Sequence, residues 1–200
     1  MDPHCGWCYG NHKNFDEIYD KSKEKVNFEL LVGGMWLKKD APKGGKELLN
    51  FIKAHTEKIV KQTGVNISNK YYDLALDESY TFSSLEPSAA IILLKEIAPK
   101  KVFEFTYELQ KSIFIDGKKS DIFSTYESIL EELNINSKNF KKQWLSADNI
   151  KKTQDEFIRV EKISYGYPSL FIEKDGKTRV IAAGKFDVTK TIEIINKELK

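Results

Sequence analysis

Both cysteines of this 200-residue chain lie in one short segment, Asp2-Pro3-His4-Cys5-Gly6-Trp7-Cys8-Tyr9-Gly10. A helical pattern of apolar residues runs from Tyr9 to Lys25, so the pair is expected where a helix begins. There the helix dipole and the free backbone N–H groups favour a thiolate on the first sulfur. The second sulfur follows one helical turn later, within reach of the first. The spacing therefore predicts an attacking thiol at Cys5 and a resolving thiol at Cys8.

Other interpretations of the cysteine pair remain open. A zinc site would need two further ligands, and Cys5, Cys8 and His12 supply at most three well-spaced groups. A buried structural pair and chance proximity are also possible readings. A disulfide that only stabilises the fold is disfavoured, because such a small loop removes little entropy from the unfolded chain. We favour redox chemistry and expect no metal.

The composition describes an ordinary globular domain. Hydrophobic residues make up 40% of the chain, and 32 Lys and Arg against 30 Asp and Glu leave a net charge of +2. This balance gives no electrostatic reason to expect nucleic acid or an anionic membrane as a partner. The N-terminus lacks the pattern of a secretory signal and no apolar run could span a membrane, so we expect a cytoplasmic protein. A signal lost upstream would weaken that expectation.

Hydrophobic periodicity predicts a strand near the start, a long helical middle and a hairpin near the end. The strand covers Val26–Val32 and stops at Gly33-Gly34. The hairpin turns at Asp175-Gly176 between strands Ser169–Glu173 and Thr178–Ala183. The expected helices after the first strand are Lys46–Gln62, Ser88–Ile97, Lys101–Phe114, Ile122–Leu133, Ser137–Leu145, Asp148–Ile163 and Val188–Leu199.

The cysteine segment resembles the active-site block of the DsbA-like family, in particular its cytoplasmic FrnE-like branch, which shows Asp-Pro-x-Cys-x-Trp-Cys-x-Gly. The resemblance implies an α/β thioredoxin-like fold with a mixed sheet and a large inserted helical domain. Residues 1–34 and 147–200 would form the discontinuous thioredoxin-like domain, and 35–146 the insertion. Only four residues precede Cys5, so the first strand of that fold is expected to be missing. The sheet would then be rearranged, completed by another chain, or weak.

The resemblance also assigns a role to Gly166-Tyr167-Pro168-Ser169, just before the hairpin. Related folds carry a cis-proline there, facing the cysteine pair, and X–Pro bonds are the only common source of cis peptides. The backbone of Tyr167 would then pair with an extended substrate beside the attacking sulfur. The alternative is an ordinary trans proline that opens a strand. Substrate contacts are also expected from Gly6, Trp7 and His4.

The roles of several neighbouring residues stay open. A partly protonated His4 would favour the Cys5 thiolate, but an exposed turn residue is an equal reading. Asp2 either accepts or relays a proton from the resolving thiol or only shapes the turn, and we favour the second. Trp36 is expected in the core or in an interdomain contact rather than in a substrate cleft, and His12 is expected on the surface.

These features predict a thiol–disulfide oxidoreductase that acts on protein or small-molecule disulfides, without a bound cofactor. One alternative is a redox-independent adaptor that uses the helical insertion to dock a partner. Another is a glutathione-dependent isomerase of the kappa-transferase type, although such proteins usually rely on a serine or a single thiol. The sequence determines neither the direction of exchange nor the oligomeric state.

Overall fold

We describe residues 1–199 in a computed structural model. Ten α-helices and two β-strands are assigned in this range. The strands are β1 (Ser169–Lys174) and β2 (Lys177–Ala183). The helices are α1 (Gly6–Gly10), α2 (His12–Ser22), α3 (Lys46–Thr63), α4 (Asn69–Leu76), α5 (Leu85–Ile97), α6 (Val102–Phe114), α7 (Ser124–Glu132), α8 (Ser137–Trp144), α9 (Ala147–Glu161) and α10 (Val188–Glu198).

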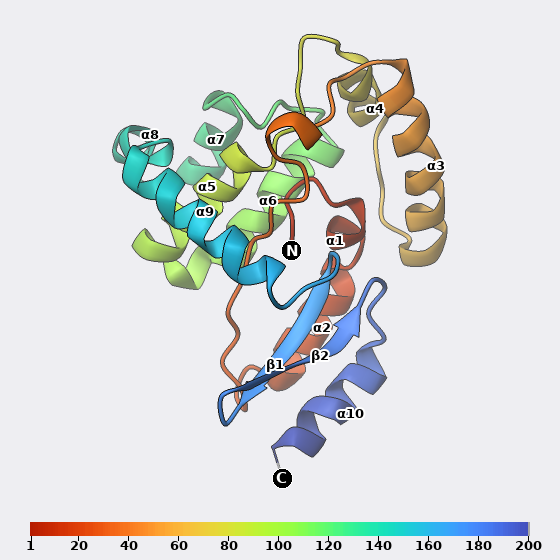
Figure 1. The fold of residues 1–200 in the computed structure, drawn as a ribbon, viewed down its shortest axis with the longest axis vertical. Coiled ribbons are helices and arrows are strands. Elements are labelled where there is room, and N and C mark those ends of the chain that lie inside the picture. The colour runs from red at the N-terminus through yellow and green to blue at the C-terminus, as the bar shows by residue number, and fades with distance from the viewer. Residues whose placement is uncertain (200) are drawn as a thin grey trace.

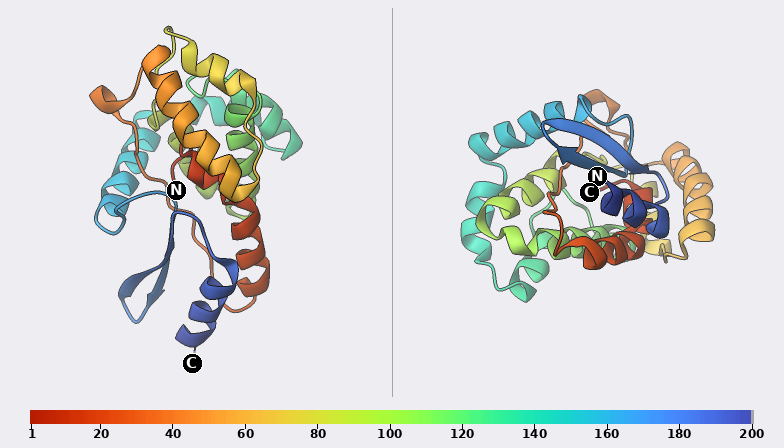
Figure 2. Two further views of the ribbon diagram at one scale, coloured as in Figure 1. Left: turned by 90° about the vertical axis from the view of Figure 1, so that its right-hand side faces the viewer. Right: turned by 90° about the horizontal axis from the view of Figure 1, so that it is seen from below.

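The molecule has a helical part and a smaller part that contains the hairpin. Figure 1 shows α3 to α9 gathered in the upper half, with β1, β2, α2 and α10 below them. The N-terminus lies where the two parts meet, and both views of Figure 2 agree with this arrangement. The cysteine segment therefore lies at the junction rather than at the edge of either part.

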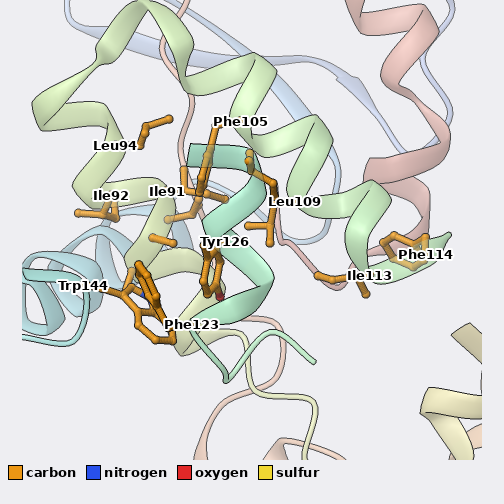
Figure 3. Packing of buried hydrophobic residues seen from close by; sticks show 14 of the residues in the cluster. Ile91, Ile92, Leu94, Phe105, Leu109, Ile113, Phe114, Phe123, Tyr126 and Trp144 are labelled. Atoms are coloured by element: carbon orange, nitrogen blue, oxygen red, sulfur yellow. The ribbon is translucent and has the colours of Figure 1, made fainter. Parts of the chain in front are cut away.

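Apolar packing is concentrated in the helical part. Its core is built around α5 and α6, whose Ile91, Leu94, Phe105 and Leu109 are fully or almost fully buried. Figure 3 shows these side chains interleaved with Tyr126 and with aromatic residues of the neighbouring helices. The hairpin part has a separate cluster with only three buried apolar residues, Ile18, Phe186 and Ile195.

The sheet is smaller than the sequence predicted. β1 and β2 pair antiparallel from Ser169 opposite Ala183 to Lys174 opposite Lys177, and they form the only sheet assigned within residues 1–199. The predicted strand Val26–Val32 is wrong as a paired strand, and the mixed sheet is not formed. This segment keeps the alternating burial of a strand, but no neighbouring strand is present in the described range to pair with it.

Most of the other predicted elements are confirmed to within a few residues. Gly64 ends α3 in the left-handed conformation, with φ of 70°. Ser146 caps α9 by accepting a hydrogen bond from the Asn149 N–H. Two features were missed. The predicted first helix is divided at Asn11 into α1 and α2, and α4 was not predicted at all.

The proposed domain boundaries at 34/35 and 146/147 stay a prediction. Tyr9, Val32 and Phe157, from the two outer segments, belong to the same buried cluster as the helices of the insertion. The core is therefore continuous across both boundaries. No helix within residues 1–199 is long and apolar enough to cross a membrane.

Candidate functional site

The two cysteines lie at the start of α1, as predicted. Cys5 is the N-cap residue, and its Sγ accepts a hydrogen bond from the backbone N–H of Cys8 at 3.3 Å. Both cysteines are present as free thiols and both are buried, with exposed fractions of 5% and 7%. The first N–H groups of a helix have no backbone partner. The N–H of Cys8 is one of these groups, and its hydrogen bond to Cys5 Sγ holds that sulfur close to Cys8.

The loop before β1 lies directly against Cys5. The Tyr167–Pro168 peptide bond is cis, as expected, and the carbonyl oxygen of Tyr167 accepts a hydrogen bond from the Cys5 thiol at 3.4 Å. The two residues are 162 positions apart in the sequence. Figure 1 shows this loop reaching α1 from the end of α9. The structure therefore brings together Cys5, Cys8 and the Tyr167–Pro168 turn, which the sequence singled out separately.

The sequence predicted that the helix start favours the thiolate of Cys5, which means a lowered pKa, and this prediction is wrong. Burial raises the pKa of the Cys5 thiol well above its ordinary value, and the hydrogen bond with the Cys8 thiol raises it further. The Cys8 N–H acts in the opposite direction, but it does not compensate for the loss of water. A short helix N-terminus therefore stabilises the thiolate less than burial destabilises it. A raised pKa favours the protonated form of the Cys5 thiol.

His4 is placed differently from both sequence-based readings. Its side chain is 2% exposed, and its Nε2 lies 3.1 Å from the carbonyl oxygen of Ser83 and 3.1 Å from Ser120 Oγ. Burial lowers the pKa of His4 to about 4, so the imidazole is neutral at pH 7. It cannot supply a positive charge to Cys5, and it is not an exposed turn residue. Its depth also removes it from contact with a substrate at the surface.

Asp2 shapes the turn that precedes the cysteines. Its carboxyl group accepts hydrogen bonds from the backbone N–H groups of His4 and Met35 at 2.9 and 2.8 Å. Burial raises the pKa of Asp2 to about 6. The side chain thus shapes the turn, as predicted, and also ties it to the segment at Met35.

Gly6 and Trp7 are the two positions of the segment 2–10 that are not buried. They are therefore the parts of the cysteine segment with the most solvent exposure, and their contact with a substrate stays a prediction. Trp36 packs against the main core and lies near His4, with ring centroids 6.0 Å apart, as expected. His12 is not a free surface residue, because its Nε2 lies 3.0 Å from Gln110 Oε1.

Two residues that hold the site in place were missed by the sequence analysis. Asn11 joins α1 to the end of the hairpin: its Nδ2 donates to the carbonyls of Trp7 and Gly184, and its Oδ1 accepts from the Phe186 N–H. Gln110 donates from α6 to the carbonyl of Pro3 at 3.2 Å. The only available signal was an asparagine directly after Gly10, where a helix can end.

Comparison with solved structures identifies the fold. The structure superposes on a protein from Nitrosomonas europaea, proposed to be a protein disulfide isomerase, with a TM-score of 0.87 over 99% of this chain and 94% of that chain. The sequences are 20% identical. The chain has a DsbA-like thioredoxin fold. No family model matches the sequence, and no curated protein matches it either.

A second neighbour of this DsbA-like fold is the cytosolic disulfide reductase DsbM from Pseudomonas aeruginosa. Its TM-score is 0.81 at 20% identity, and the match covers 100% of this chain and 96% of that chain. The same reductase with GSH gives a TM-score of 0.80 at 19% identity. The likeness spans the helical insertion as well as the hairpin part, so the α/β fold class with its inserted helices is confirmed.

Proposed function

We propose that the protein is a thiol–disulfide oxidoreductase in which Cys5 attacks and Cys8 resolves. The observation that carries the proposal is the position of one sulfur. Cys5 Sγ lies 3.3 Å from the N–H of Cys8 and 3.4 Å from the carbonyl of Tyr167, so the thiol faces both a resolving residue and a backbone edge. The names of the two structural neighbours, a proposed isomerase and a reductase, support the same chemistry.

The exchange is a two-electron transfer in two steps. The Cys5 thiol first loses its proton, and the thiolate attacks one sulfur of a substrate disulfide and displaces the other as a thiolate. The Cys8 thiol then loses its proton and attacks Cys5 Sγ, which releases the second substrate sulfur. The protein ends with a Cys5–Cys8 disulfide, and the substrate ends with two thiols that take up the two protons. The reverse sequence oxidises a dithiol substrate.

The substrate is expected to bind across the loop before β1. The carbonyl of Tyr167 accepts a hydrogen bond from the Cys5 thiol, so an extended peptide that pairs with the backbone of this loop would bring its disulfide close to the sulfur. Gly6 and Trp7 would line the opposite side, since they are the accessible residues of the cysteine segment. Protein disulfides and small disulfides such as oxidised glutathione are the proposed partners.

The direction of exchange follows from the state of Cys5. Strong oxidants owe their potential to a stabilised thiolate in the reduced form. Here burial raises the Cys5 pKa, and His4 is neutral, so the reduced form lacks that stabilisation. We therefore place the protein toward the reducing end of the range from about −270 to about −120 mV. We propose the cytoplasm as its compartment, where thiols are kept reduced.

The test is a redox titration of the purified protein in glutathione buffers of stepped potential. We expect one Cys5–Cys8 disulfide to form and disappear reversibly, with a midpoint closer to about −270 mV than to about −120 mV. The same preparation should reduce a protein disulfide when reduced glutathione is supplied. Failure to form the intramolecular disulfide at any potential would contradict the proposed function, whereas a midpoint near about −120 mV would contradict only the direction.

Gly33 is predicted to position the Tyr167 loop. A Cβ atom at Gly33 would lie 2.0 Å from Tyr167 Oη and 2.2 Å from its Cζ, so Gly33→Ala must displace that ring. Because the Tyr167 carbonyl contacts Cys5, we expect the exchange rate to fall about tenfold or more. Gly166→Ala is the matched control, since a Cβ there meets no atom within 4 Å. Equal rates for the two variants, at equal melting temperatures, would argue against this role.

A further inference from the structure

The side chain of Asn11 lies between the helix that carries the cysteines and the end of the hairpin. It is 1% exposed and belongs to the residue that separates α1 from α2. Its Nδ2 group donates at 2.7 Å to the carbonyl of Trp7 and at 2.9 Å to the carbonyl of Gly184. Its Oδ1 atom accepts at 2.7 Å from the N–H of Phe186. A single buried amide therefore binds three backbone groups from two distant segments of the chain.

These hydrogen bonds belong to a closed path that returns to the attacking sulfur. The N–H of Gly184 donates to the carbonyl of Pro168 at 3.0 Å. The preceding carbonyl, that of Tyr167, accepts from the Cys5 thiol at 3.4 Å. The cysteine helix therefore contacts the Tyr167–Pro168 loop directly at the sulfur and indirectly through Asn11. Because a thiol is a weak donor, we expect the path through Asn11 to fix the position of the loop relative to Cys5 Sγ.

The position of Asn11 requires a side chain with two donors. Trp7 and Gly184 both present carbonyl oxygens, which only accept, and the asparagine amide supplies one hydrogen to each of them. A buried carbonyl that loses its donor is unfavourable. Without the amide, we therefore expect the end of the hairpin, and the loop that it contacts, to shift relative to α1.

Asn14 provides a matched comparison on α2. Its Nδ2 group donates to the carbonyl of Phe186 at 3.1 Å and lies 3.5 Å from Asn11 Oδ1. Among residues 1–199, no hydrogen bond joins the side chain of Asn14 to α1. Replacement of Asn14 therefore removes a link between the same two parts of the chain and leaves the cysteine helix untouched.

We propose that Asn11 is a positioning residue that sets the distance between Cys5 Sγ and the loop on which an extended substrate binds. The inference rests on the proposed function and adds a difference between substrates. A peptide that pairs with the loop has its disulfide placed by the loop, and a displacement of about 1 Å is enough to slow attack strongly. A small disulfide that does not pair with the loop can follow the sulfur. Attack on chain-bound disulfides therefore depends on Asn11, and attack on small disulfides does not.

The test measures single-turnover attack by the reduced protein on two disulfides. One is a linear peptide whose central cysteine is disulfide-bonded to 2-mercaptoethanol, and the other is bis(2-hydroxyethyl) disulfide. We expect Asn11→Ala to slow attack on the peptide at least about tenfold and attack on the small disulfide less than about threefold. In Asn14→Ala, both rates should change less than about threefold. The ratio of the two rates is informative because both reactions need the same Cys5 thiolate, so a changed pKa or folded fraction cancels.

Asn11→Asp is the second variant of the test. It keeps the shape of the side chain and an acceptor for the Phe186 N–H, but when ionised it has no donor for Trp7 or Gly184. We expect the same selective loss as in Asn11→Ala. Melting curves identify which of the two variants is folded, and if only one is folded, its ratio decides.

Two outcomes would overturn the proposal. One is a ratio of the two rates that stays at the parent value in the folded Asn11 variants. The other is an equal fall of this ratio in Asn14→Ala, which would show that any link to the hairpin has the same effect. A parent protein that attacks neither disulfide would instead contradict the proposed function, so the two failures can be distinguished.

Discussion

A Cys5→Ser variant is expected to lose disulfide exchange, with a fall in rate of at least about a thousandfold. The hydroxyl of serine cannot form the mixed disulfide, and it is the Cys5 thiol that hydrogen-bonds the Tyr167 carbonyl, beside which the substrate is proposed to bind. The measurement is turnover of a protein disulfide with reduced glutathione as the electron source. Retained turnover in this variant would defeat the assignment of the attacking thiol.

The partner variant Cys8→Ser should behave differently. Cys5 can still attack, but no second sulfur releases the substrate, so a mixed disulfide should accumulate to one substrate per protein. Mass spectrometry under non-reducing conditions would detect it, and a reductant should reverse it. The double variant separates redox chemistry from the adaptor alternative: a partner complex that survives the loss of both sulfurs would support an adaptor.

In a His4→Gln variant, the free energy of unfolding is expected to fall less steeply as the pH is lowered. Burial lowers the pKa of His4 to about 4, against about 6.5 in the unfolded chain. Protons therefore bind the unfolded state more readily, and stability is complete above about pH 6.5 and lost as the pH falls toward about 4. At pH 4.5 the loss due to His4 is about 2 to 3 kcal/mol in the free energy of unfolding.

Asp2 changes the free energy of unfolding with pH in the opposite direction, so its contribution must be separated from that of His4. Burial raises its pKa to about 6, so its contribution to stability is complete at low pH and is lost as the pH rises through about 6. Denaturant titrations of the parent and His4→Gln at several pH values between 4.5 and 7.5 would isolate the histidine. His55→Gln, on the exposed face of α3, is the control. If the free energy of unfolding depends on pH in the same way in the parent and in His4→Gln, His4 is not buried as a neutral side chain.

Local sequence patterns predicted the chemical centre of the site. The relative position of the two sulfurs could be predicted from the Cys-x-x-Cys spacing, because the N-cap residue and the first helical turn that hold them lie within four residues. The Tyr167–Pro168 turn was predicted through a resemblance and not through spacing, since nothing in the intervening chain indicates that it reaches Cys5. The helical middle was predicted well because its stripes and caps are local signals.

Long-range properties could not be predicted in this way. The alternation in Val26–Val32 indicates a strand, but pairing also needs a neighbour that periodicity does not supply. The pKa of Cys5 depends on how deeply the folded chain buries it, and the helix position alone suggested the wrong direction. His4 was misjudged for the same reason, because its contacts, Ser83 and Ser120, come from distant parts of the chain.

The depth of the two sulfurs also bears on damage by reactive oxygen species. Peroxide converts accessible thiolates to sulfenic acid and then to sulfinic acid, a step that is irreversible in nearly all proteins. A protonated and enclosed sulfur is a poor target for that chemistry. The burial that raises the pKa of the Cys5 thiol is therefore expected to spare it from irreversible overoxidation as well.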